Sequence, residues 1–131
     1  VLHITNELTK KNFSIASLIF FISKHLYKSY KFDYSILASK AEKFLFDDKN
    51  INQIQLSNWI SIFFKIKILS KNILNYDVIH IHGIWAPIQI LSILICNLRK
   101  KNYVIHPHGM LLDEALKSTG FFKYIYKISV L

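Results

Sequence analysis

Hydrophobic and polar positions follow two different periods along the chain, and together they predict an α/β domain. Short apolar runs typical of buried strands open the chain and recur near its middle and its end. Between them lie longer segments with apolar residues three and four positions apart, as in amphipathic helices. The predicted strands are residues 1–5, 32–38, 51–56, 78–82 and 103–106, and the predicted helices are 13–27, 57–75, 88–98, 111–117 and 121–131. This alternation favours one domain built on a mostly parallel sheet.

Individual residues sharpen the helix boundaries. Ser57 is a candidate N-cap for the second long helix, whose aromatic residues Phe63 and Phe64 are expected in the core. Pro87 suits the first turn of the third helix. Because residues 88–98 are apolar nearly all round, this helix is expected to be buried against a sheet or a partner.

Composition and charge limit the class of protein. The chain has 131 residues, 52% of them hydrophobic, which suits one folded domain and excludes a disordered chain. The formal net charge of +9 comes almost entirely from lysine. It reflects either the base composition of the genome or a basic surface near anionic lipid or an anionic substrate. Nucleic acid is not an expected partner, because Arg99 is the only arginine. The single cysteine, Cys96, excludes an intramolecular disulfide.

A run of 21 residues without formal charge, from Val78 to Leu98, has the length of a membrane span. Gly83 and Pro87 interrupt it in the middle. A strand, a loop and a buried helix therefore explain the run better than a transmembrane helix does.

Two stretches that each end an apolar run in His-Gly carry the candidate chemistry. His82-Gly83 follows one predicted strand and His108-Gly109 follows the next, 26 residues later. In an open parallel sheet ligands bind beyond the carboxyl ends of the strands, so His82 and His108 are expected to line a site. A neutral imidazole both donates and accepts hydrogen bonds and exchanges a proton near pH 7.

Three further residues belong to this region. His80 and His106 lie two positions before these histidines, on the same strand face, and are expected to be packed supporting residues. Trp85 follows the first His-Gly and either stacks on a sugar ring at the mouth of the site or packs in the core.

The same residues resemble a known family. The stretch Asp77–Pro87 (DVIHIHGIWAP), the stretch Tyr103–Leu111 (YVIHPHGML), and Ala115-Leu116-Lys117-Ser118 with Lys123 and Tyr126 look like the N-terminal domain of a family-4 glycosyltransferase of the GT-B fold. The resemblance is specific from Asp77 to Tyr126 and loose before it. It implies that residues 1–131 form the Rossmann-like, acceptor-binding half of that fold. The C-terminal nucleotide-binding domain is not in this sequence, so we expect the chain alone to be inactive.

Family members transfer a sugar from a nucleotide-sugar donor to a hydroxyl of a glycan or lipid-linked acceptor. The reaction generally retains the anomeric configuration and uses no metal or other cofactor. Many members build bacterial surface polysaccharide or lipopolysaccharide, so the resemblance implies a cytoplasmic protein at the inner face of the plasma membrane, in peripheral contact with anionic lipid. This chain departs from the family because residues 6–14, after the first strand, lack the usual glycine pair.

The resemblance also assigns roles. His108 matches the histidine that reaches the donor sugar and the reacting centre, and we take it as the catalytic candidate. His82, Gly83 and Trp85 match the acceptor-side loop. Three residues remain as donor-side or supporting candidates: Gly109, His106 and His80.

Two other functions are compatible with the same residues. A metal-dependent hydrolase would use the His-x-His pairs, with carboxylates nearby; its candidate ligands are His80, His82, His106, His108, Asp113 and Glu114. A non-enzymatic, membrane-associated protein would use the aromatic and basic segment Phe121–Lys127.

Overall fold

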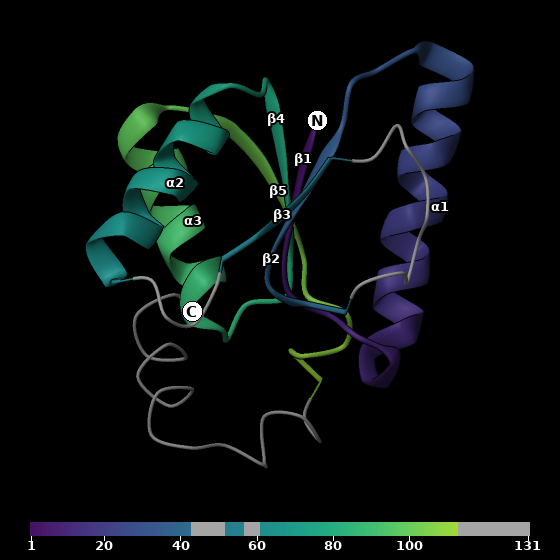
Figure 1. Ribbon diagram of the computed structural model, residues 1–131, viewed down its shortest axis with the longest axis horizontal. Helices are drawn as coiled ribbons and strands as arrows, with labels where there is room; N and C mark the ends of the chain where they lie inside the picture. Colours follow the sequence, from purple (N-terminus) through teal and green to yellow (C-terminus); the bar gives the residue numbers. More distant parts are fainter. Residues whose placement is uncertain (43–51, 57–60, 113–131) are drawn as a thin grey trace.

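The computed structural model describes residues 1–42, 52–56 and 61–112, which form a five-stranded parallel sheet flanked by helices (Figure 1). The strands are β1 (Leu2–Leu8), β2 (Ser35–Ala41), β3 (Asn52–Gln55), β4 (Val78–His82) and β5 (Asn102–His106). The helices are α1 (Phe13–Tyr30), preceded by the 3-10 turn η1 (Lys10–Asn12), α2 (Ile62–Leu74) and α3 (Pro87–Arg99). The predicted α/β class with a parallel sheet is confirmed.

The order of the strands separates the connection that leaves β1 from the connection that leaves β4, at the carboxyl ends of these two strands. Across the sheet the order is β3-β2-β1-β4-β5. Strands β2 and β3 are therefore added on one side of β1, and β4 and β5 are added on its other side. Every neighbouring pair is parallel. The connections that leave β1 and β4 therefore diverge at the carboxyl ends of these strands, and such a switch point is where open parallel sheets bind ligands.

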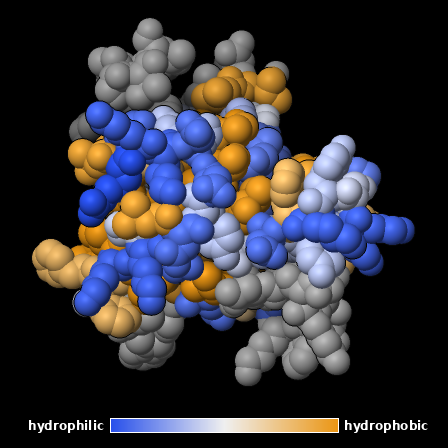
Figure 2. All heavy atoms as spheres, turned by 90° about the horizontal axis from the view of Figure 1, so that it is seen from above, coloured by the Kyte–Doolittle hydropathy of each residue, from blue (hydrophilic) through white to orange (hydrophobic). Residues whose placement is uncertain are grey.

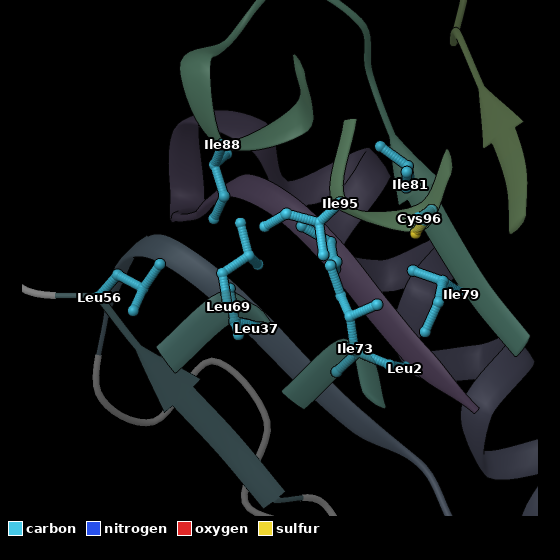
Figure 3. Close-up of a cluster of buried hydrophobic side chains, with 11 residues drawn as sticks. Leu2, Leu37, Leu56, Leu69, Ile73, Ile79, Ile81, Ile88, Ile95 and Cys96 are labelled. Carbon is cyan, nitrogen blue, oxygen red and sulfur yellow. The ribbon is translucent and has the colours of Figure 1, made fainter. Parts of the chain in front are cut away.

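The main hydrophobic core lies between the sheet and the helix pair α2 and α3 (Figures 1 and 3). Alternate side chains of β1 and β4, such as Ile4 and Ile81, point to this face and are fully buried. Helix α1 covers the other face over β1 and β2, where Ala16 and Ile19 pack on Ile36. His3 and Thr5 of β1 and the even-numbered positions of β4 and β5 consequently lie on the face that carries α1.

Two expectations for the helices were wrong. Helix α2 begins after Ser61, whose Oγ accepts a hydrogen bond from the backbone N–H of Phe64, and not after Ser57, which lies outside the described residues. The side chain of Phe63 is 80% exposed and that of Phe64 is also exposed.

Helix α3 begins at Pro87 as predicted, but only one side of it is buried. Leu98 is 82% exposed and Leu94 is also exposed, whereas the polar residues Gln89 and Ser92 are buried. Both polar side chains bond to backbone carbonyls, Ser92 Oγ to that of Ile88 and Gln89 Nε2 to that of His82. Helical geometry, and not hydropathy alone, decides which face of α3 packs on the sheet.

The uncharged run from Val78 to Leu98 divides into β4, a loop and α3, as the sequence predicted. Within the described ranges no helix is both long enough and apolar enough to span a membrane. Figure 2 views the protein from the end at which β1 begins, and both hydrophilic and hydrophobic side chains reach that surface.

Candidate functional site

Five histidines gather on the face of the sheet that carries α1, and they extend from the interior of the sheet to the carboxyl ends of β4 and β5. They are His3 of β1, His80 and His82 of β4, His106 of β5, and His108 just beyond β5. The sequence predicted the last four as a group, and the structure brings all four together. It adds His3, whose backbone pairs with that of His80 in the parallel register.

Three of these imidazoles form a continuous hydrogen-bonded chain. The Nδ1 of His3 lies 3.0 Å from the Nε2 of His82. The Nδ1 of His82 in turn lies 3.0 Å from the Nε2 of His108. Both nitrogens of His82 are therefore occupied, and its ring is only 2% exposed. The chain, here named the imidazole chain, runs from the buried His3 to the half-buried His108.

The remaining two histidines form a parallel pair beside the imidazole chain. The Nδ1 of His80 lies 2.9 Å from the Nε2 of His106. The ring of His106 also faces that of His82, with centroids 4.8 Å apart and planes 10° apart. His80 and His106 thus pack against each other and against the imidazole chain, and their supporting role in a site stays a prediction.

Strand register explains why the hydrogen bonds join these particular residues. His3 pairs with His80 across the β1–β4 ladder, and His82 pairs with His106 across the β4–β5 ladder. Each imidazole hydrogen bond instead joins a histidine to the residue two positions beyond its register partner, such as His82 to His108. Residues two apart share a face, so each ring reaches diagonally toward the carboxyl edge of the sheet.

Burial makes the inner rings of this cluster poor bases. The pKa of His3 is lowered to about 3, mainly by removal from water and then by repulsion from positive charge on His80. Burial likewise lowers the pKa of His82 to about 2, with repulsion from a charged His3 as the next cause. The pKa of His80 and that of His108 are also lowered, again mainly by burial. At neutral pH these rings are neutral, so each has one N–H donor and one acceptor nitrogen.

The loop after β4 is closed by a side chain that the sequence analysis did not single out. The Nε2 of Gln89 donates to the carbonyl of His82 at 2.6 Å, and its Oε1 accepts from the N–H of Ala86 at 2.8 Å. Gly83 has a φ of +98°, and a Cβ at this position would lie 2.3 Å from the Gln89 Nε2. The N–H of Gly83 donates to the carbonyl of His106 at 2.8 Å, which continues the β4–β5 ladder into the loop.

His108 lies in a tight turn with an uncommon backbone conformation. The N–H of Met110 donates to the carbonyl of Pro107 at 2.9 Å. The two central residues, His108 and Gly109, have φ values of +49° and +77°, as in a type I′ turn. A residue other than glycine is uncommon at positive φ, and such positions concentrate at functional sites. The bond from His82 holds the imidazole while the turn carries it past the end of the sheet.

The other predicted residues have the following positions. Trp85 lies in the loop after Gly83 and is half-buried, and its proposed stacking on a sugar stays a prediction. Gly109 is exposed beside His108. Asp113, Glu114 and the segment 115–127 lie outside the described residues.

The predicted alternative of a metal site receives no support from the placed side chains. Across residues 1–42, 52–56 and 61–112, no three His, Cys, Asp or Glu side chains are positioned to hold a metal ion. The imidazole nitrogens of His82 instead face nitrogens of neighbouring rings.

Comparisons with protein-family models, with curated protein sequences and with solved structures find no match for this chain. The activity of the site must therefore be inferred from its own residues.

Proposed function

We propose that this chain is the acceptor-binding domain of a glycosyltransferase of the GT-B type. The observation that carries the proposal is the hydrogen bond between His82 and His108 at the carboxyl edge of the sheet, beside the β1–β4 switch point. There a neutral, half-buried imidazole is held at a fixed position where open parallel sheets bind ligands. The likeness of the two His-Gly stretches to family-4 enzymes points to a sugar as the ligand.

The chemistry of His108 suits a sugar. A neutral imidazole offers one donor and one acceptor, and a sugar hydroxyl can satisfy either. Since the Nε2 of His108 faces His82, its Nδ1 is the nitrogen left for a ligand. In sugar transfer, charge develops near the bond that breaks. A fixed N–H beside that bond stabilises the charge, because the N–H is already in position and does not have to reorganise during the reaction.

We assign two of these residues roles that differ from those implied by the resemblance. With both nitrogens engaged and its ring buried, His82 supports His108 and does not itself contact the acceptor. Gly83 is buried against Gln89 and shapes the loop. His108 and Trp85 remain the residues proposed to touch the sugar, and the nucleotide-sugar donor is bound together with a second, nucleotide-binding domain. In this proposal the reaction takes place in the cytoplasm, at the inner face of the plasma membrane.

Sugar binding by the chain is the direct test. We expect saturation-transfer NMR to detect binding of at least one member of a panel of oligosaccharides, soluble lipid-linked acceptor analogues and UDP-, GDP- and ADP-sugars. The His108→Ala variant should bind that ligand about tenfold more weakly, which is the value of one or two lost hydrogen bonds.

His25→Ala is the matched control, because His25 is an exposed histidine of α1 on the outer surface. It should bind with unchanged affinity. No binding across the panel, or equal losses in the two variants, would contradict the proposed function.

A further inference from the structure

His3, the innermost ring of the imidazole chain, has one nitrogen without a hydrogen-bond partner among the described residues. His3 is fully buried, at 0% exposure. Its Nδ1 faces His82, while its Nε2 is buried with no hydrogen-bond partner among the described residues. The imidazole chain therefore does not conduct protons through the protein, because it ends at His3.

The unpartnered Nε2 of His3 determines the direction of the two hydrogen bonds in the imidazole chain. A neutral chain of three imidazoles has two arrangements. In one, every ring carries its proton on Nδ1, so that His3 donates to His82 and His82 donates to His108. In the other, every ring carries its proton on Nε2, and the Nε2–H of His3 points into the protein without an acceptor. Buried N–H groups without acceptors are rare, so the first arrangement is favoured.

We propose that His3 is a positioning residue that fixes His108 as a hydrogen-bond donor. By donating from Nδ1 to the Nε2 of His82, it makes His82 donate to the Nε2 of His108, and the proton of His108 then resides on the outward Nδ1. Among the described residues nothing else hydrogen-bonds to this nitrogen of the half-exposed ring. Its Nδ1–H is thus presented to a ligand oxygen, such as a sugar hydroxyl or ring oxygen. Only this choice of ligand rests on the proposed function.

The second histidine pair has the same orientation. His80 also directs its Nδ1 at the Nε2 of the residue nearer the edge of the sheet, His106. Both rows of rings are therefore aligned from β1 toward β5. Such alignment lets each polarised bond strengthen the next one, so that a change at His3 reaches His108 across two hydrogen bonds.

The tautomer of His108 can be measured without any ligand. We expect imidazole ¹H–¹⁵N correlation spectra of the labelled 131-residue chain at pH 7.5 to show the Nδ1–H form at His3, His82 and His108. His3→Leu removes both the Nδ1–H that donates to His82 and the unpartnered Nε2. The ratio of the Nδ1–H form to the Nε2–H form at His108 should then fall about tenfold. His3→Asn is the matched variant, because its side-chain amide can still donate to His82, and it should keep the Nδ1–H form.

Two outcomes would overturn the proposal. One is the Nε2–H form at His108 in the unmodified chain, a result that needs no variant to fold. The other is an unchanged tautomer ratio in a folded His3→Leu protein. The oligosaccharide and nucleotide-sugar panel separates this proposal from the proposed function. A tautomer shift without sugar binding supports the positioning role and rejects the glycosyltransferase, whereas sugar binding without a shift does the reverse.

Discussion

Lowering the pH from 7.5 to 5.5 is expected to reduce the free energy of unfolding by about 3 kcal/mol. Two buried rings are the main cause. The pKa of His3 in the folded protein is about 3 and that of His82 about 2, because burial disfavours the charged form. In the unfolded chain both return to the ordinary value near 6.5.

Acid destabilises the folded protein because the unfolded chain takes up protons that the folded protein does not. Between pH 6.5 and about pH 3 the unfolded chain binds protons at these two residues and the folded protein does not, so acid favours unfolding. The stability contributed by the neutral rings is complete above pH 6.5 and is lost progressively below it. Each ring contributes about 1.4 kcal/mol per pH unit in that window. His80 and His108, whose pKa values are also lowered, act in the same direction.

Urea unfolding followed by circular dichroism at several pH values measures this dependence. In His3→Leu the loss between pH 7.5 and 5.5 should fall to about half, since one of the two buried bases is gone. His25→Gln changes an exposed histidine and should leave the slope as it is. A loss below about 1 kcal/mol in the unmodified chain would show that the folded protein accepts protons on these rings.

The amino-acid sequence predicted the five strands, although β2 begins and ends three residues later than the predicted strand 32–38, and it predicted the approach of His82 to His108. Strand β4 is short, apolar and followed by glycine, and these local signals do not depend on the rest of the fold. The same is true of His82, which ends β4, and of His108, which follows the end of β5 by two residues; each precedes a glycine. Parallel strands place their carboxyl ends at one edge, so the two residues had to approach each other.

His3 was missed because its role depends on the order of the strands. It lies 79 positions from His82 in the sequence, and only the placement of β1 next to β4 makes them neighbours. A signal was nevertheless present: the opening strand alternates Leu2, His3, Ile4 and Thr5, and the polar members of that pattern share one face. If β1 had been placed at the centre of the sheet, His3 would have been predicted on the histidine face.

Gln89 was missed for a different reason. A lone polar residue in an apolar helix is usually solvent-exposed, and nothing in its spacing shows that its amide reaches backward to the loop before the helix. That contact depends on the backbone conformation of Gly83. The exposed leucines of α3 follow from the same geometry, because the side of the helix that bears Gln89 and Ser92 faces the sheet.

Replacing Gly83 with alanine is expected to destabilise the protein by about 3–5 kcal/mol. A φ of +98° is strained for any residue with a side chain, at a cost of about 1–3 kcal/mol. The new Cβ would also lie 2.3 Å from the Gln89 Nε2, so the amide must move and lose its bonds to His82 and Ala86. Each lost bond costs about 1 kcal/mol.

Gly109→Ala is the matched control, because it tests positive φ without the clash. The φ of Gly109 is +77°, and among the described residues a Cβ there would meet only the Leu112 side chain, at an ordinary 3.4 Å. This variant should cost about 1–2 kcal/mol, from backbone strain alone. The difference between the two glycine variants, measured by urea unfolding, isolates the contribution of Gln89.

A double-mutant cycle then shows whether Gln89 is the group that Gly83 protects. Gln89→Ala alone should cost about 2 kcal/mol, for its two hydrogen bonds to the loop. Because Gly83→Ala already breaks these bonds, the double variant should be less destabilised than the sum of the single variants, by about 2 kcal/mol. Strictly additive costs would mean that the amide adapts to the alanine while keeping its bonds. In that case the loop carrying Trp85 does not depend on the contact between Gly83 and Gln89.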